Sequence, residues 1–546
     1  MKLTDFFKEK ETASSRRRIG KEEISVATGV LRDYKNSKSA LEGRITEDEQ
    51  WWRLRHWETF GKEQDKGKTK SVSAWLFNTI TSKHADAMDS FPDASVLPRA
   101  RDDEEEAKLL SGILPAIMEH NNFEEIYSNN WWYKLKHGCC AYGVFWNSEA
   151  ENGLGDIQIK KIDLLNIFWE PGVTNIQKSR NLFIVDLKDA DILESEYPFL
   201  KGKNLGSAID VKQYIYDDTV DISNKVLVVD WYYKLRNPDG KTVLHYCKFV
   251  GDNVLFASEN EEEYKDCGWY DHGEYPIVLD SLFPEEGTPV GFGFVAVTKN
   301  PQMYIDKLGD AILDNALMAA KPRYFAKVSA GVNEQEFLDW SKPIVHVEGD
   351  INEERLRPIG VSQLPPVCTN ILQMKINELK ETSSNSDFNR GSAGGGVTAA
   401  SAIAALQEAG NKMSRDMLKA TYRAYTAINY LCIELIRQFY TETRCFRIGT
   451  ADGGYSFSDY SNKNLKAVQN GGNLYRKPVF DIAVKTQKKS PYTRLAQNEL
   501  AKELFRLGFF NPQNSQCALA ALEIMDFEGK RAVEEKIREL SQNERM

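Results

Sequence analysis

The clearest pattern in the chain is a stripe of small and apolar side chains between residues 398 and 441. Residues spaced three or four apart lie on one face of a helix. Thr398 provides an N-cap and no proline precedes Tyr440, so one helix of about 40 residues, roughly 60 Å long, is predicted. Its small members favour close packing, either in the core of a large monomer or against a neighbouring copy of the chain. The stripe consists of Ile403, Leu406, Gly410, Met413, Met417, Ala420, Ala424, Ile428, Leu431 and Leu435.

Two further helices flank a short module that precedes this segment. The first begins near Phe294, carries apolar residues at Ile305, Leu308, Ile312, Ala316 and Ala319, and ends at Lys321-Pro322 because proline cannot continue a helix. The second runs from Cys368 to about Glu381. Between them, strands are predicted at 324–328 and 344–347. A projecting pair of helices with a compact tip is therefore expected.

The region before the first of these helices mixes both kinds of structure. Residues 71–146 read as mostly helical, with a buried strand at 138–146. From 157 to 282 the pattern changes to short β runs, such as 226–231 and 243–250, separated by turn residues. Residues 446–484 read as irregular or β, and helices begin again at Ser490-Pro491 and Asn511-Pro512. The predicted fold class is α+β with several domains.

Length and charge narrow the classes of function. A chain of 546 residues exceeds what one hydrophobic core usually supports, so two to four domains are expected. The formal net charge of −10 argues against a broad basic surface that grips nucleic acid. It is compatible with a conduit, because a channel through which DNA slides needs few tight phosphate contacts.

The eight cysteines have no CxxC spacing, so neither a disulfide framework nor a zinc site is expected. Cys139 and Cys140, with His137 nearby, are interpreted as inert thiols at a buried strand or helix end. The N-terminal segment is too charged for a signal peptide, and Arg16 to Arg18 fit a solvated arm. No run of 18 apolar residues predicts a membrane span.

A search for catalytic motifs gives no defensible site. Gly291-Phe292-Gly293 lacks the third glycine of a dinucleotide fingerprint and fits a tight turn before a helix. The acidic runs 102–106 and 261–263 lack metal-ligand spacing, although a metal-dependent nuclease that uses Asp102 or Glu104 is a minor alternative. No catalytic residue, metal site or cofactor is predicted.

The glycine-rich segment 382–397 fits a mobile loop better than a nucleotide cradle, because no lysine follows at the required place. Arg390 offers one positive charge there, and Lys375 and Lys380 on the preceding helix are candidates for the same passage. A row of basic residues on the long helix fits either DNA or subunit contacts or a solvated flank. The row consists of Lys412, Arg415, Lys419 and Arg423.

From about Ser71 to Leu540, this order of parts resembles the portal proteins of tailed bacteriophages and their prophages. The stretches that carry the resemblance are 291–322 (GFGFVAVTKNPQMYIDKLGDAILDNALMAAKP), 391–415 (GSAGGGVTAASAIAALQEAGNKMSR) and 490–513 (SPYTRLAQNELAKELFRLGFFNPQ). The alternatives are another ring-forming virion component, such as a scaffold or adaptor, and the nuclease.

The resemblance implies a portal-like architecture. An N-terminal arm and the start of the wing occupy 1–70, followed by a mixed α/β wing at 71–292. Stem helices at 293–321 and 367–381 enclose a small α/β clip at 322–366. After a tunnel loop at 382–397 come a long wing helix at 398–441, the remainder of the wing at 442–489 and a helical crown at 490–546.

The same resemblance implies a ring, usually of twelve copies, at one capsid vertex, through which double-stranded DNA is packaged and ejected. The implied partners are further copies of the chain, DNA, the terminase large subunit, the major capsid protein, a scaffold and a head-tail adaptor. The chain is expected in the virion, and in the host cytoplasm during assembly. The residues implied to line the channel are Phe388, Asn389, Arg390, Gly391, Gly394, Gly395, Gly396, Lys375 and Lys380.

Overall fold

In the computed structural model the chain divides into two compact units. The larger unit comprises Met1–Glu49, Ile80–Ala296 and Ser386–Met546, and the smaller unit comprises Gln50–Thr79 and Val297–Asn385. The structure describes residues 18–57, 71–206, 224–236, 242–320, 364–383, 412–449 and 455–465, together with shorter stretches between and after these ranges. The coarse prediction of a multidomain α+β chain is confirmed.

A five-stranded antiparallel meander forms one sheet of the larger unit. Strands that follow one another in sequence pair with one another, as short turn-linked β runs predict. The strands predicted at 226–231 and 243–250 are therefore confirmed, although both are longer than expected. In order, the strands are β4 (Ile167–Trp169), β5 (Asn181–Asp189), β6 (Lys225–Arg236), β7 (Thr242–Val250) and β8 (Asn253–Ala257).

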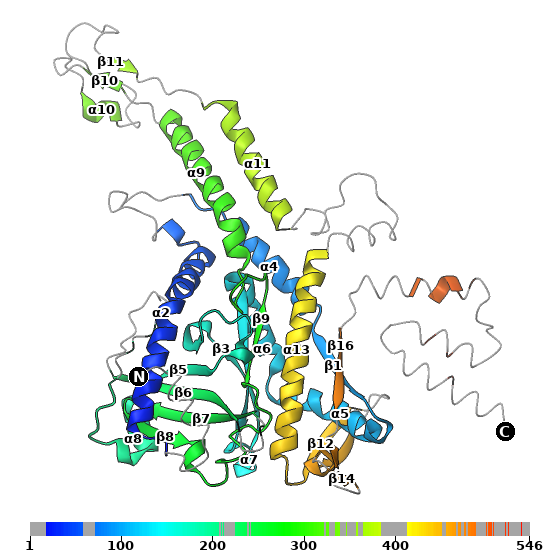
Figure 1. Ribbon diagram of the computed structural model, residues 1–546. Coiled ribbons are helices and arrows are strands. Elements are labelled where there is room, and N and C mark those ends of the chain that lie inside the picture. The colour runs from blue at the N-terminus through cyan, green and yellow to red at the C-terminus, as the bar shows by residue number, and fades with distance from the viewer. Residues whose placement is uncertain are drawn as a thin grey trace. The chain divides into compact units, whose positions relative to one another are not determined.

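One face of this sheet is covered by helix α2 (Lys21–Trp52) (Figure 1). Ile24, Leu31 and Tyr34 are buried in one cluster with Phe183 and Trp231 of the sheet. The sequence pattern predicted only an arm and the start of a domain here. The apolar positions do have helical spacing, but many charged residues between them concealed the pattern.

A second sheet has the order β3–β2–β9, with β2 (Cys139–Asn147) in the centre, β3 (Asp156–Ile162) and β9 (Ile277–Ser281). The predicted strand at 138–146 is thus confirmed. The expected helices at 71–146 are α4 (Trp75–Met88), α5 (Glu104–His120) and α6 (Phe123–His137). Gly138 ends α6 with φ of 89°, and a side chain at this position would overlap the backbone of Phe292.

One strand within the supposedly helical region was missed. Strand β1 (Pro92–Pro98) pairs antiparallel with β16 (Phe480–Thr486), almost 400 residues later in the chain. The β character expected at 446–484 is confirmed by β12 (Arg444–Gly449), β13 (Tyr455–Tyr460), β14 (Val468–Asn470) and β15 (Leu474–Arg476). Most of the expected C-terminal helices lie outside the described residues, although residues 501–504 are helical.

The long helix is described as α13 (Lys412–Phe439), and its predicted part at 398–411 lies outside the described residues. Met417, Ile428, Leu431 and Leu435 are buried, which confirms the stripe within the described part of the helix. Ala424 is buried within the same chain, so its small side chain serves intramolecular packing rather than an exposed interface.

A buried ion pair between α6 and β9 is hydrogen bonded to α13. The Lys134 ammonium on α6 donates to Asp280 Oδ1 of β9 at 2.7 Å and to Thr421 Oγ1 of α13 at 2.8 Å. The Thr421 hydroxyl donates to Asp280 Oδ2 at 2.8 Å. Both charged side chains are at most 1% exposed. The charges are tolerated because each one has the other and further hydrogen bonds as partners.

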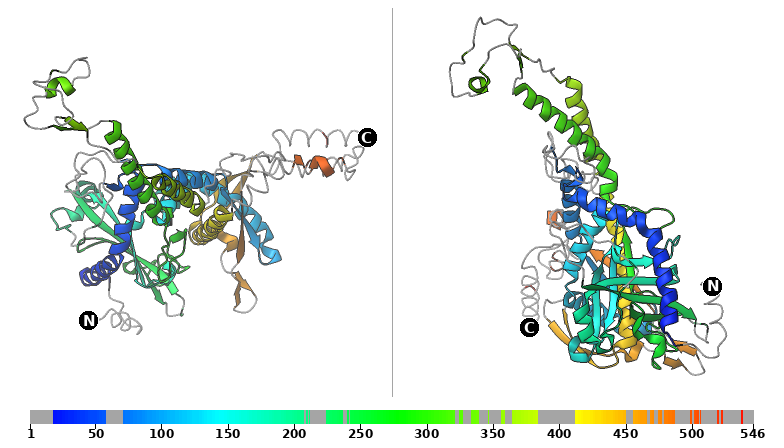
Figure 2. Two further views of the ribbon diagram at one scale, coloured as in Figure 1. Left: turned by 90° about the horizontal axis from the view of Figure 1, so that it is seen from above. Right: turned by 90° about the vertical axis from the view of Figure 1, so that its left-hand side faces the viewer.

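The smaller unit contains two long helices, α9 (Phe294–Ala320) and α11 (Pro366–Thr382), which run side by side (Figures 1 and 2). Both match their predicted positions. The chain between them includes β10 (Tyr324–Ala326), which pairs with β11 (Leu356–Pro358), and the short helix α10 (Glu334–Leu338). The first strand was expected, β11 was missed, and the expected strand at 344–347 lies almost entirely outside the described residues.

The remaining short elements lie in the larger unit. They are helices α7 (Ala150–Gly153) and α8 (Ala190–Glu196), and single 3-10 turns at Arg101–Asp103, Leu164–Asn166, Ile176–Lys178, Pro198–Leu200, Ser258–Asn260 and Asn462–Leu465.

Lys38 fixes α2 to the first sheet from inside the core. Its ammonium donates to the backbone carbonyls of Leu164 and Ile167 and lies 4.3 Å from the ring centre of Phe168. Desolvation by burial lowers the pKa of Lys38 to about 7, although Glu42 and Asp163 oppose this shift. The side chain therefore loses its proton within the neutral range.

The titration of Lys38 has a measurable consequence. Because its folded-state pKa lies below that of the unfolded chain, the unfolded chain binds more protons between about pH 7 and 10, and stability rises with pH there. From pH 7 to 9 this group adds about 2 kcal/mol. Thermal melts should show this rise in the wild type and in Lys21→Met, whose exposed lysine lies on the same helix. Lys38→Met should lack it, and an equal rise in Lys38→Met contradicts the assignment.

Candidate functional site

The two helices of the smaller unit form the candidate functional site, and their base is held by buried polar groups. Asp306 of α9 accepts hydrogen bonds from the Ser73 amide at 2.9 Å and from the Ser73 hydroxyl at 2.6 Å. Its other oxygen lies 3.1 Å from His56 Nε2, and both side chains are at most 1% exposed. Gln302 accepts from the Leu76 amide at 3.2 Å and so caps the start of α4.

This polar base was not predicted from the sequence. Its members come from residues 50–79 and from α9, more than 220 residues apart in sequence. Asp306 and Gln302 are spaced four apart, which places both on one face of α9. The only signal in the sequence was the presence of Gln302 and Asp306 beside the apolar stripe of a predicted helix. This pattern does not identify the residues that they contact.

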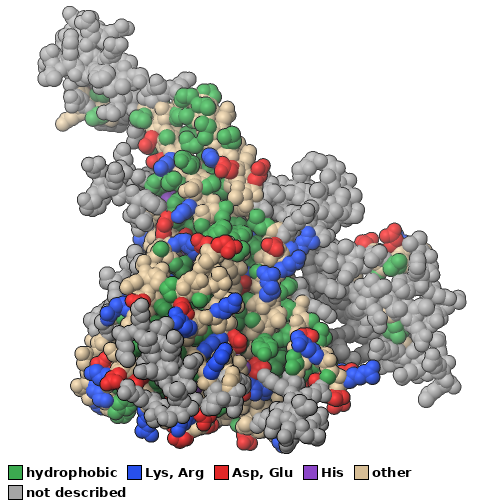
Figure 3. All heavy atoms as spheres, in the orientation of Figure 1, with side chains coloured by type: hydrophobic (Ala, Val, Ile, Leu, Met, Phe, Trp, Pro, Cys, Tyr) green, Lys and Arg blue, Asp and Glu red, His purple; other side chains and the backbone are tan. Residues whose placement is uncertain are grey.

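The outer part of α9 shows a different surface. Of its predicted apolar face, Ile305 is buried, but Ala316 and Ala319 are exposed. Hydrophobic side chains gather over α9 and α11 (Figure 3). A single copy of the chain thus leaves much of this apolar surface in water. The large side chains exposed here are Tyr304, Leu313, Leu317, Met318, Val367, Ile371 and Met374.

Two of the predicted channel residues lie on α11. Lys375 Nζ donates to Glu378 Oε2 at 2.6 Å and lies 5.8 Å from the ring centre of Tyr304. Lys380 Nζ lies 5.5 Å from the ring centre of Trp75. Five helical residues correspond to a turn of about 140°, so the two lysines lie on different sides of α11. The other predicted channel residues lie outside the described part of the chain: Phe388, Asn389, Arg390, Gly391, Gly394, Gly395 and Gly396.

The basic row on α13 is largely exposed. Arg415, Lys419 and Arg423 are all exposed. Arg423 also borders a groove of about 550 Å³ between α13 and β9, together with Ala420 and Ala427. The exposure of these three side chains agrees with a solvated flank. It is equally compatible with contacts to DNA or to another subunit.

The acidic run 102–106 has a structural place at the start of α5. Negative charge is favourable at a helix N-terminus. Glu106 is buried and accepts hydrogen bonds from the Tyr460 hydroxyl and, at 3.1 Å, from Asn464 Nδ2. The second run, 261–263, is exposed. Among the described residues, neither run contributes to a group with metal-ligand spacing, so nothing in this geometry favours the nuclease alternative.

Cys139 and Cys140 are completely buried. Burial raises the pKa of both thiols, and the nearby Asp280 carboxylate raises it further. His137 instead lies between Asp48 and Glu49, at 3.6 and 3.7 Å. Although burial alone raises the pKa of Glu49, the nearby His137 ring and the hydrogen-bonded Lys136 ammonium lower it to about 2. These contacts support the prediction of inert thiols.

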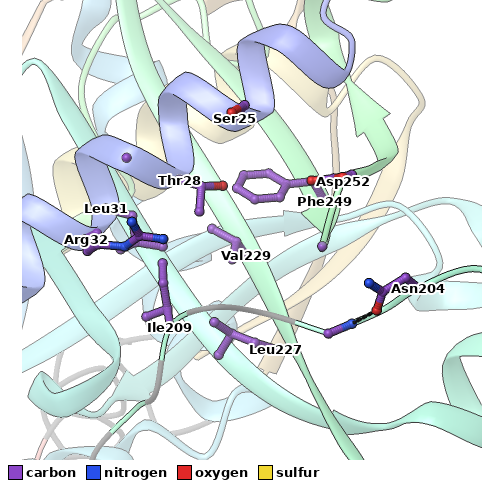
Figure 4. Close-up of a pocket in the computed structure, with 13 residues that line it drawn as sticks. Ser25, Thr28, Leu31, Arg32, Asn204, Ile209, Leu227, Val229, Phe249 and Asp252 are labelled. Atoms are coloured by element: carbon purple, nitrogen blue, oxygen red, sulfur yellow. Dashed lines mark hydrogen bonds between the residues drawn. The ribbon is translucent and has the colours of Figure 1, made fainter.

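A cleft of about 380 Å³ lies between α2 and the first sheet (Figure 4). Leu227, Val229 and Phe249 form its apolar part. Its ionisable lining residues, Arg32 and Asp252, lie at opposite ends in this view, so they do not form a paired acid and base. The cleft therefore offers no catalytic constellation.

Comparison with protein families identifies the class of protein to which this chain belongs. The model of the family described as Phage P22-like portal protein matches residues 85–278 and 245–545. The chain therefore belongs to the P22-like phage portal protein family. This family is structural rather than enzymatic, and it implies an oligomeric ring in the virion capsid that associates with capsid and terminase. A comparison with curated proteins found no match.

The helices of the described part of the chain lack the combination of length and apolarity that a bilayer span requires.

The polar base of the two-helix site can be tested by mutation. Asp306→Ala should lower the free energy of unfolding by about 3 kcal/mol, because His56 and the Ser73 amide lose a buried acceptor. Asp314→Ala, which removes an exposed carboxylate from the same helix, should change it by less than about 0.5 kcal/mol. Thermal unfolding measures the loss of stability in each variant, and the rate of amide hydrogen exchange at residues 71–79 shows whether the base has loosened. Equal effects would show that the Asp306 contacts are not required.

Proposed function

We propose that α9 and α11 are the stem of a portal ring and that neighbouring copies pack against each other along them. The observation that carries this proposal is the exposed apolar surface of these two helices. Contiguous apolar surface of this kind usually marks an interaction site. In a ring of identical subunits, each interface joins two different surfaces, one from each neighbour. The apolar patch can therefore form such an interface only if a complementary surface lies elsewhere on the same chain.

The size of the apolar surface supports this role. Several of the side chains are about half exposed, for example Leu313 at 48% and Leu317 at 51%. Burial of the exposed half stabilises by about 1 kcal/mol per side chain. Seven such side chains therefore contribute several kcal/mol, which is comparable to the lower estimates of the entropic cost of association. Because each subunit of a closed ring has two interfaces, the ring is favoured over an isolated pair.

Assembly can be tested with a pair of substitutions. Leu313→Glu combined with Leu317→Glu should abolish or severely reduce rings, because two charges would enter an apolar contact. Ile192→Glu places the same charge at an exposed apolar position on α8 and should leave assembly unchanged. Single-particle micrographs and native mass measurements give the subunit number. Rings of the double variant equal in yield to the wild type would refute the stem assignment.

The remaining assignments follow the same architecture. Residues 71–292, 398–441 and 442–489 form the wing, residues 322–366 the clip and residues 490–546 the crown, with the N-terminal residues joining the wing. The ring has about twelve subunits. Its partners are the terminase large subunit, the major capsid protein, a scaffold and a head-tail adaptor, and assembly takes place in the host cytoplasm. Family membership supports these roles in general terms.

We further assign residues 382–397 to a loop that contacts DNA in the channel, with Arg390, Lys375 and Lys380 as its positive charges. The acidic net charge of the chain supports weak and transient contact rather than tight binding.

Deletion of residues 384–395 should leave ring assembly intact and reduce the amount of packaged or retained DNA. Electron microscopy of the ring and quantification of DNA per particle give the two readouts. Full packaging by the deletion variant contradicts a role of the loop, whereas loss of the ring shows that the segment is needed for assembly.

A further inference from the structure

Three side chains with metal-ligating atoms meet in the larger unit. His120 is the last residue of α5, Glu151 lies in the turn α7 and Asp156 is the first residue of β3. One ring nitrogen and one oxygen from each carboxylate lie within 4.8 Å of one another. This is the only such group among the described residues.

The separations between these side chains are longer than direct hydrogen bonds and leave room for an ion. His120 Nε2 lies 3.5 Å from Glu151 Oε1, and His120 Nδ1 lies 3.4 Å from Asp156 Oδ2. Both distances exceed the usual N–H···O distance of about 2.9 Å. The two carboxylates face different ring nitrogens, and one ion binds only one of these. The three ligand atoms, now within 4.8 Å of one another, must therefore move to the roughly 3.4 Å that separates ligand atoms around a tetrahedral metal. His120 is 62% exposed and Glu151 is 48% exposed, so both can rotate toward one ion without disturbing the core.

Asp156 is already oriented by its neighbours. Its Oδ1 accepts hydrogen bonds from the Tyr440 hydroxyl and from the Ile157 amide, each at 2.7 Å. The Oδ2 atom is the one that lies toward His120. Arg444 holds the preceding turn by donating to the carbonyls of Leu154 and Gly155, at 2.9 and 2.7 Å. Hydrogen bonds of this kind orient the ligands of protein metal sites.

The charges restrict the kind of ion. Two carboxylates and a neutral imidazole balance one divalent cation, and His120 lies at the C-terminal end of a helix, where positive charge is favourable. Arg444 and Arg447 border the same cleft, of about 540 Å³, and oppose a cation. Because one of the three ligands is an imidazole nitrogen, ions that prefer oxygen ligands, such as Mg²⁺ or Ca²⁺, are disfavoured relative to ions that bond strongly to imidazole.

We propose that His120, Glu151 and Asp156 bind one divalent transition-metal ion, with Zn²⁺ as the best fit and an open fourth position for water. The ion would cross-link the end of α5, the turn and the start of β3. Through the hydrogen bond between Asp156 and Tyr440, it also steadies the chain just after α13. The existence of the site does not depend on ring assembly. It departs from the sequence-based expectation of no metal site.

The test uses the full-length protein after treatment with a chelator. Titration with Co²⁺ should give one equivalent of saturable binding with the visible absorption of a tetrahedral complex, Zn²⁺ should displace it, and Zn²⁺ should raise the melting temperature. His120→Ala and Glu151→Gln should each weaken binding at least about tenfold. Because both side chains are largely exposed, these variants should fold normally without metal.

The matched control is His346→Ala. His346 Nδ1 lies 2.8 Å from Glu336 Oε2, so this variant also removes an exposed histidine with a carboxylate partner. It should bind Co²⁺ like the wild type. Absence of saturable binding in the wild type overturns the proposal. Unchanged affinity in both His120→Ala and Glu151→Gln overturns it as well, because the ion would then bind elsewhere.

Discussion

The buried ion pair between Lys134 and Asp280 is the interaction on which the larger unit most depends. Neither charge has access to water, so each is stable only while the other is present. Thr421 completes the pair by hydrogen bonding to both side chains. Since these residues lie on α6, β9 and α13, the register of the three elements is set by one polar contact. An apolar contact would tolerate sliding, whereas unpaired buried charges do not.

In the smaller unit, different parts of α9 make contacts within the chain and expose apolar side chains. Near its start, Gln302 and Asp306 bind the beginning of α4 and His56 through directed hydrogen bonds. Farther along, Leu313 and Leu317 are exposed and have no such constraint. Directed polar contacts fix the helix within its own chain, while apolar side chains remain available to another copy. This division suits a family whose members act as rings.

Two groups of side chains that suggest chemistry in the sequence have structural surroundings in the fold. The acidic run 102–106 leads into helix α5, and Glu106 accepts hydrogen bonds from Tyr460 and Asn464. The adjacent thiols at Cys139 and Cys140 are too deeply buried to react readily. Side chains that suggest chemistry in a sequence thus serve folding here, and the family that the chain belongs to is structural.

The sequence by itself determined the elements that depend on local periodicity and on helix-breaking residues. It predicted α9, α11 and the stripe of α13, because an amphipathic helix records its buried face at a spacing of three to four residues. It also predicted β2, β6 and β7. The order of these parts was sufficient to indicate the portal family. Local patterns and order along the chain are properties that a single sequence contains.

Only the tertiary structure decided which distant residues meet. The pairing of β1 with β16, the polar base around Asp306 and the group formed by His120, Glu151 and Asp156 all join segments whose partners no local pattern identifies. Helix α2 was missed because its apolar face became evident only against the sheet that it covers. Likewise, the exposure of Leu317 follows from what surrounds it and not from its own neighbours in sequence. Contacts between remote segments depend on packing in three dimensions, and a one-dimensional pattern does not specify them.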